Sequence, residues 1–218
     1  MKSWFLFFAL LVISPFIQAT PLNHIHLNKL FRPSTLGSQI AYWNHQIGPA
    51  WKVWGNTQVY KVGDCRVELN VNRGVIESMS LDVSSKCNPD IAGFLASPKP
   101  IYPYQMTFAS WDGEGEYYAD CLLMCGNAEA AYVHLFIPGF HANNFIDVTL
   151  TSNMEEDPTL TQALKWEKIM ENKEGEDYVI DEKFNCDQKY EHVAEKLLKS
   201  SPINRITVGV DLSAKMCH

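Results

Sequence analysis

The 218-residue sequence has little positive charge, because 18 Lys and Arg residues stand against 25 Asp and Glu residues and give a formal net charge of -7. The basic residues form no dense patch of the kind that binding to a phosphate backbone requires. We therefore do not expect nucleic acid as a partner, nor an anionic lipid surface.

The sequence also lacks the short motifs that mark common catalytic sites. It contains no G-x-S-x-G nucleophile elbow, no P-loop and no glycine-rich dinucleotide fingerprint. His24 and His26 lie close to the N-terminus and His218 ends the chain, positions where a histidine is usually only solvated. No nucleophile can be paired with a base, so we expect neither nucleophilic hydrolysis nor a cofactor or metal.

Only one long hydrophobic run occurs, and it lies at the N-terminus. Trp4–Ile13 is an unbroken apolar stretch, preceded by Lys2 and followed by the small residue Ala19. This is the pattern of a secretory signal peptide, and the run is shorter than the roughly 20 apolar residues that span a bilayer. We predict a signal peptide over residues 1–19 and no membrane span in the mature chain, a retained anchor being the alternative. Loss of Lys2 would change the net charge from -7 to -8.

Cysteines are few, but their number is even and all of them follow the predicted cleavage site. In an exported chain this favours disulfides, although the sequence cannot choose among the possible pairings. We predict one bond from the expected strands: Cys65 opens one strand and Cys87 follows the next, so antiparallel pairing would bring them together. Such a bond would stabilise the fold by roughly 3 kcal/mol. The six cysteines are Cys65, Cys87, Cys121, Cys125, Cys186 and Cys217.

The segment from Cys121 to Cys125 allows three interpretations. Its C-x3-C spacing differs from the C-x-x-C spacing of dithiol redox motifs. A zinc site would need two further ligands, and oxidation competes with metal binding in an exported chain. We therefore expect disulfides. The two cysteines could bond to each other, but we predict bonds to Cys186 and Cys217, which would join this loop to the last helix and strand.

Hydrophobic periodicity predicts two units joined by a proline-rich connector near residues 98–103. The first unit, residues 20–97, is expected to hold a short amphipathic helix followed by a small antiparallel meander with tight turns. The helix is predicted over Leu36–Ile47, and the strands over Trp51–Trp54, Gln58–Val62, Cys65–Val71 and Val75–Val83.

The second unit, residues 104–218, is expected to combine antiparallel strands with two helices packed on one side, so that the whole chain is α+β. One helix is predicted from Pro158 to Gly175 and another after Asp187, with Asp177–Phe184 extended between them. The predicted strands are Gln105–Trp111, Ala131–Ile137, Asn144–Thr151 and Ile203–Leu212.

An acidic loop containing Asp112, Glu114, Glu116 and Asp120 resembles the opening of a calcium-binding loop. It departs from that pattern where glycine and a bidentate glutamate are needed, so at most a weak cation site is expected. The same acids beside aromatic residues also suggest a glycosidase pair, but neighbouring loop acids seldom provide the required separation across a cleft. We expect a solvated acidic loop.

Two groups of segments resemble known protein families. The segments GEYYADCLLMCGNAE, NNFIDVTL, KWEKIMENKEGEDYVIDEKFNCDQKY and INRITVGVDL resemble a family of small exported bacterial proteins of unknown function, over most of residues 37–212. That resemblance implies no activity. In its turn pattern the first unit is also loosely similar to the helix-plus-meander modules of outer-membrane assembly lipoproteins, without their lipid-bearing cysteine. This second resemblance implies binding more than catalysis.

These observations predict a disulfide-stabilised α+β protein of the bacterial cell envelope, periplasmic or secreted, that binds an unknown protein or envelope component. One alternative is a hydrolase acting on an envelope or extracellular polymer, with Asp112, Glu114 and Glu116 as the acids. Another is an inhibitor or immunity-type protein, whose acidic charge would steer it towards a basic partner.

Overall fold

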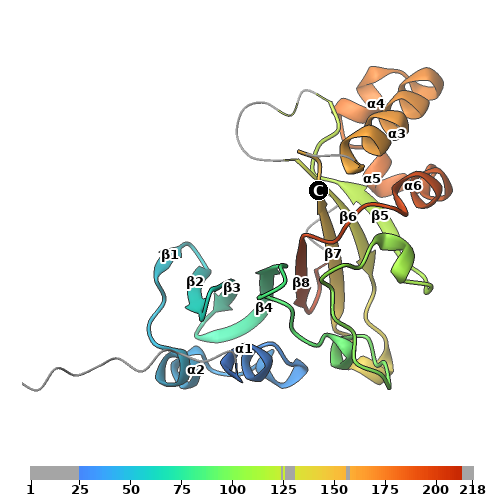
Figure 1. Cartoon of the computed structure of the whole chain (residues 1–218). Helices are drawn as coiled ribbons and strands as arrows, with labels where there is room; N and C mark the ends of the chain where they lie inside the picture. The colour runs from blue at the N-terminus through green and yellow to red at the C-terminus, as the bar shows by residue number, and fades with distance from the viewer. Residues whose placement is uncertain (1–24, 124, 126–130, 156–157, 213–218) are drawn as a thin grey trace, which may run out of the picture.

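One antiparallel sheet of eight strands forms the centre of the protein (Figure 1). The computed structural model describes residues 25–123, 125, 131–155 and 158–212, and the predicted signal peptide lies outside them. The strand order is β1-β2-β3-β4-β8-β7-β6-β5. With the helices and the disulfides, this sheet confirms the predicted disulfide-stabilised α+β class.

The first half of the sheet is the predicted meander. Helices α1 and α2 lie side by side beneath it in Figure 1. Arg73 and Gly74 have φ values of 52° and 81°, so the turn between β3 and β4 has two left-handed residues, as tight hairpins require. The elements are α1 (Ile25–Leu30), α2 (Ile40–Ile47), β1 (Lys52–Trp54), β2 (Thr57–Val62), β3 (Cys65–Asn72) and β4 (Val75–Asp82).

Helix α2 begins later than predicted because the residues before it pair with β4. The Gly37 amide donates to the Ile76 carbonyl at 2.8 Å, and the Ile76 amide donates to the Ser38 carbonyl at 3.0 Å. An isolated bridge joins Gln39 to Val75. Residues 37–39 therefore satisfy backbone groups of β4, which a helical conformation here would leave unpaired.

The second half holds the remaining strands, and its helices gather beside β5 (Figure 1). No helix among the described residues combines the length and apolar character that crossing a membrane demands. The elements are β5 (Glu116–Ala119), β6 (Tyr132–Ile137), β7 (Asp147–Asn153), α3 (Thr159–Glu174), α4 (Glu176–Ile180), α5 (Phe184–Asp187), α6 (Glu191–Leu198) and β8 (Arg205–Gly209).

Two predicted segments of this half have a different conformation. Gln105–Trp111 is not a strand: Phe108–Ser110 forms a 3-10 turn, at whose start the Thr107 amide donates to the Ser110 hydroxyl. Asp177–Phe184 is not extended, because helix α4 covers its first part. A helical turn buries Tyr178 and Val179 together, which an extended chain would place on opposite faces.

The last strand joins the two predicted units into one sheet. β8 pairs with β4 from Ser78↔Gly209 to Asp82↔Arg205, and it pairs with β7 on its other side. The connector between the units therefore divides the sequence without dividing the sheet.

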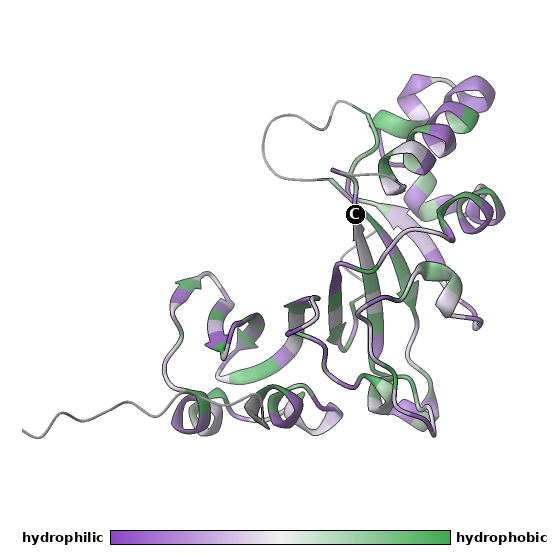
Figure 2. Ribbon diagram, in the orientation of Figure 1, coloured by the Kyte–Doolittle hydropathy of each residue, from purple (hydrophilic) through white to green (hydrophobic). Residues whose placement is uncertain are grey.

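The core follows the period of two that the sequence shows. One row of apolar side chains crosses four neighbouring strands and is almost completely buried. Burying each such side chain stabilises the fold by roughly 1.5–3 kcal/mol. Figure 2 shows hydrophobic residues along the strands, whereas α3 and α4 carry many hydrophilic residues. The row consists of Leu81, Ile206, Leu150 and Leu135.

The disulfides confirm one prediction and correct another. Cys65 and Cys87 are bonded as predicted, with Cα atoms 5.4 Å apart. Cys121 is bonded to Cys125, so the predicted bonds from this segment to Cys186 and Cys217 are wrong. The Cα atoms of Cys121 and Cys125 lie 5.5 Å apart, within the usual range for a disulfide. Cys186 is also disulfide-bonded, and Cys217 lies outside the described residues.

Candidate functional site

The predicted acidic loop lines a pocket of about 480 Å³ beside strand β5. Asp112 and Glu114 contribute from the loop, and three residues of α6 contribute as well: Glu191, His192 and Glu195. The other two predicted acids are elsewhere: Glu116 begins β5 and is exposed, and Asp120 follows β5. The structure therefore brings together two of the four predicted acids.

Glu191 completes the hydrogen bonding of the sheet edge. Both oxygens of its carboxylate accept from the Tyr117 amide, at 2.9 and 2.8 Å. Burial raises the pKa of Glu191 to about 7, and the negative charges of Glu116 and Glu195 act in the same direction. The side chain is thus a structural acceptor for an edge strand that would otherwise have a free amide.

Asn185 does the same for the next backbone position of β5 that faces the sheet edge. Its Oδ1 accepts from the Ala119 amide at 3.0 Å, and its Nδ2 donates to the Ala119 carbonyl at 2.8 Å. Neither Glu191 nor Asn185 was predicted from the sequence, because each acts on a strand more than 60 residues away and no motif links them.

The described residues contain no cluster of three or more His, Cys, Asp or Glu side chains placed to hold a metal ion. The nearest arrangement to a catalytic constellation joins Asp120, His134 and Thr151. His134 Nε2 lies 3.0 Å from Asp120 Oδ1, and His134 Nδ1 lies 2.9 Å from Thr151 Oγ1. Tyr118 stacks on the imidazole, and burial raises the pKa of its hydroxyl. Since Thr151 is only 3% exposed, its hydroxyl is out of reach of a substrate. The group acts as a polar network between β6, β7 and the end of β5, buried at His134 and Thr151 and exposed at Asp120.

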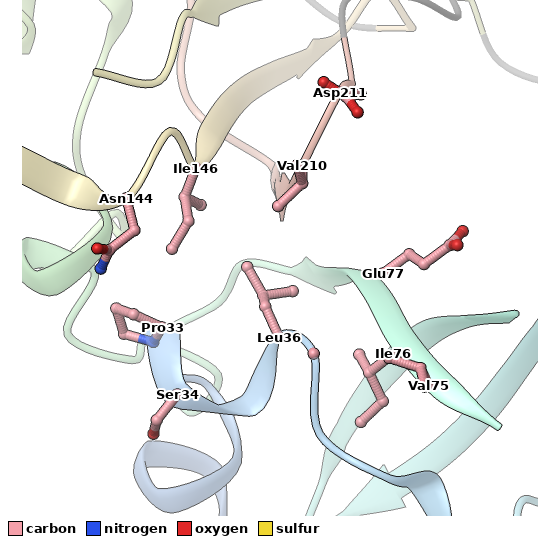
Figure 3. Close-up of a pocket in the computed structure, with 11 residues that line it drawn as sticks. Pro33, Ser34, Leu36, Val75, Ile76, Glu77, Asn144, Ile146, Val210 and Asp211 are labelled. Carbon is pink, nitrogen blue, oxygen red and sulfur yellow. The ribbon is translucent and has the colours of Figure 1, made fainter. Parts of the chain in front are cut away.

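A larger hollow of about 820 Å³ opens where β4 and β8 part. The pairing of the two strands ends at Ser78↔Gly209. Beyond that point residues 37–39 take the place of β8 beside β4. The hollow lies where β8 and this segment move apart. We call this hollow the apolar groove (Figure 3). It is lined by Pro33, Ser34, Leu36, Gly37, Val75, Ile76, Glu77, Asn144, Ile146, Val210 and Asp211.

Hydrogen bonds of the buried Thr35 and the partly buried Ser38 fix the groove wall that carries Pro33 to Gly37. Thr35 Oγ1, which is fully buried, donates to the Leu30 carbonyl at 2.6 Å. Ser38 Oγ donates to the Thr35 carbonyl at 2.6 Å and accepts from Trp43 Nε1 at 2.8 Å. The wall is therefore tied to both α1 and α2, in addition to its backbone bonds with β4.

Asp147 fixes the facing wall. This residue is 8% exposed, and its carboxylate accepts from the Gly139 amide at 2.8 Å and from the Leu212 amide at 2.9 Å. The first contact holds the loop before β7, and the second holds the segment after β8. One buried carboxylate thus positions both Ile146 and Val210, although it does not line the groove itself.

The loop before β7 is further ordered by Asn143, which is 3% exposed. Its Nδ2 donates to the carbonyls of Phe94 and Ile146 at 2.7 and 3.0 Å. The next residues, Asn144 and Phe145, both have a φ of 58°. For a bulky residue such as Phe145 this left-handed conformation costs about 1–3 kcal/mol, and such strain is often found at functional sites.

The groove is apolar inside and acidic at its rim. Leu36, Ile146 and Val210 converge on its interior, whereas the carboxylates of Glu77 and Asp211 lie outside it, apart from each other and directed away from the apolar side chains (Figure 3). Within the described part of the chain, neither carboxylate forms an ion pair. The groove was not predicted from the sequence, because four separate segments build it.

Comparison with known proteins gives no further guidance. No protein-family model, curated protein or solved structure matches this chain, so the two resemblances stay predictions and the functional proposal rests on the geometry of the two hollows.

Proposed function

We propose that the protein is a non-enzymatic binding protein of the bacterial cell envelope, which takes the apolar part of an amphiphilic envelope component into the apolar groove. The observation that carries this proposal is a hollow with apolar walls that buried side chains hold open. Its volume of about 820 Å³ falls within the usual range for small-molecule sites.

The prepared walls favour binding. Asp147 fixes one wall and Thr35 with Ser38 fixes the other, so little of the groove has to be ordered when a ligand enters. Ordering loops and side chains on binding reduces affinity, and a preformed site reduces that cost. Val210, which is 47% exposed, offers apolar surface that a ligand would cover.

An envelope location agrees with the covalent structure. Disulfides and the lack of a membrane-spanning helix among the described residues are compatible with an extracellular or periplasmic protein. A signal peptide over residues 1–19 would deliver the chain there, and amphiphilic molecules are abundant in that compartment.

The acidic pocket supports the hydrolase alternative less well. Glycoside hydrolysis needs two carboxyl groups free to act on opposite sides of a bond. Glu191, whose pKa is raised, already uses both oxygens to hold the Tyr117 amide. Removing it from that contact for catalysis would leave an edge-strand amide without its acceptor.

Fluorescence titration with the neutral dye N-phenyl-1-naphthylamine tests the proposal. Val210→Trp places a large ring inside the groove, and Leu164→Trp makes the same kind of change on the exposed face of α3. We expect saturable dye binding by the unmodified protein and by Leu164→Trp, and binding weakened at least roughly tenfold in Val210→Trp. Equal binding by the two variants, or no binding by the unmodified protein, would refute the proposal.

A further inference from the structure

We infer that the ligand of the apolar groove carries a positive charge next to its apolar part, and that Glu77 and Asp211 select this charge. The inference rests on the proposed function and specifies the class of ligand: an apolar chain with a cationic group at one end.

The fold brings the backbones of Glu77 and Asp211 together at the groove rim. Glu77 lies on β4 and Asp211 follows β8, the two strands that part at the groove. The amide of Val210 donates to the carbonyl of Glu77 at 3.4 Å, so the residue before Asp211 is tied directly to Glu77. The residue after Asp211 is tied to Asp147 through the Leu212 amide. Asp211 is therefore anchored on both sides at the groove rim (Figure 3).

The carboxylates at the rim differ from others on the same sheet. Arg205 pairs with both Glu68 and Asp82, so the negative charges further along β3 and β4 are neutralised within the fold. Glu77 accepts from the uncharged Asn72 side-chain amide, at 2.8 Å. Two carboxylates that have no cationic partner in the described part of the chain, bordering an apolar surface, give a negative rim that a cationic ligand complements.

The apolar interior and the charged rim together define the expected ligand. The apolar chain would contact Leu36, Ile146 and Val210, while its cationic end would lie at the rim that carries Glu77 and Asp211. Partly exposed ion pairs are individually weak, so two of them are expected to strengthen binding roughly tenfold over a neutral group.

Competition against N-phenyl-1-naphthylamine with three ten-carbon compounds tests the inference at neutral pH. Decylammonium, decanol and decanoate share the apolar chain and differ only in the charge of the end group. We expect decylammonium to bind roughly tenfold more tightly than decanol, decanoate to bind more weakly than decanol, and added salt to reduce the difference.

Two double variants identify the source of the preference. Glu77→Gln with Asp211→Asn removes the rim charges and keeps an acceptor for the Asn72 amide. Asp112→Asn with Glu114→Gln removes the same number of charges from the acidic pocket. We expect the first pair to bring decylammonium within about twofold of decanol without weakening decanol, and the second pair to leave the preference intact.

The outcomes separate the two proposals. Equal affinity of the unmodified protein for all three compounds would overturn the charge inference and leave the groove as the binding site. An equal loss of preference in both double variants would also overturn it, because the net charge of the protein would then be responsible. If neither the dye nor decanol binds the unmodified protein, the proposed function and the inference that rests on it both fall. Urea unfolding curves of all variants verify that they fold.

Discussion

The acidic pocket and the apolar groove use carboxylates in opposite ways. In the pocket, Glu191 lines the hollow and also holds the backbone of β5 through the Tyr117 amide. In the groove, a separate buried carboxylate, that of Asp147, holds the backbone. The carboxylates that line the groove, those of Glu77 and Asp211, are left without a cationic partner among the described residues.

The comparison shows that a cluster of acids in a hollow is weak support for a site. The acidic loop is the more conspicuous feature of the sequence, yet the best-buried carboxylate of its pocket is engaged in the fold. The groove has fewer charges, but they are available to a ligand. Whether a charge is already used by the fold separates the two cases.

Asp147→Ala is expected to lower the stability of the fold more than the other substitutions. The change removes the acceptor of the Gly139 and Leu212 amides, and leaving buried donors unsatisfied costs about 1–3 kcal/mol each. We expect the free energy of unfolding in urea to fall by about 3 kcal/mol and the groove to lose its dye binding. Asp147→Asn keeps one acceptor oxygen, so its free energy of unfolding should lie between those of the unmodified protein and Asp147→Ala. A loss below about 1 kcal/mol with dye binding intact would show that Asp147 does not build the groove.

Two glycine substitutions, one beside each hollow, are expected to have the next largest effect on stability. They compare the two hollows directly. A Cβ at Gly139 would collide with the backbone of Phe145 and Ile146, which cannot move away without shifting the groove wall. The atoms nearest to a Cβ at Gly113 all belong to the side chain of Trp111, beside the acidic pocket.

We therefore expect Gly139→Ala to destabilise the fold by about 1–3 kcal/mol and to weaken dye binding. Gly113→Ala should cost less, because a partly exposed side chain moves more easily than backbone, at the loss of one hydrogen bond from the Trp111 indole to the Glu114 carbonyl. Thermal or urea unfolding measures both. Similar losses of stability for the two variants would contradict the view that the wall of the groove is more rigid than that of the acidic pocket.

The smallest effect concerns the pH dependence of stability. The pKa of Glu191 is raised to about 7 from an ordinary value of 4.5, so between these values the folded chain holds a proton that the unfolded chain releases. The contribution of this group to stability therefore decreases as pH rises through that window. Glu191→Gln keeps an oxygen for the Tyr117 amide and does not ionise.

We expect the variant to lack this part of the decrease and to gain stability relative to the unmodified protein above about pH 7. Urea midpoints measured from about pH 5 to about pH 8 test this. Parallel curves for the two proteins would mean that the carboxyl group ionises normally in the folded state.

Local patterns were enough to predict much of the fold. The meander from β1 to β4 follows from alternation within each strand and from turn residues such as Gly63 and Gly74, which both have positive φ. The Cys65–Cys87 bond followed from the same pairing. The long helix α3 lies between Pro158 and Gly175, within one residue of each predicted boundary.

The rest depends on contacts between distant residues, which local patterns do not encode. The pairing of β4 with β8, which includes Leu81 and Ile206, makes the chain one sheet. Nothing in the sequence of β8 indicates that β4 is its partner. Asp112 and Glu114 were predicted as a candidate site, but Glu191 joins them from a remote helix. The groove combines residues near 35, 76, 145 and 210, so it exists only after the sheet is complete.

A titration of the ¹⁵N-labelled protein with decanol, followed by amide chemical shifts, tests the central claim most directly, because a neutral ligand reports on the hollow and not on its charges. We expect the largest shifts at Gly37, Ile76 and Val210, with the amides of Gly113 and Glu191 unchanged. Shifts centred on the acidic pocket, or no shifts in either hollow, would contradict the account.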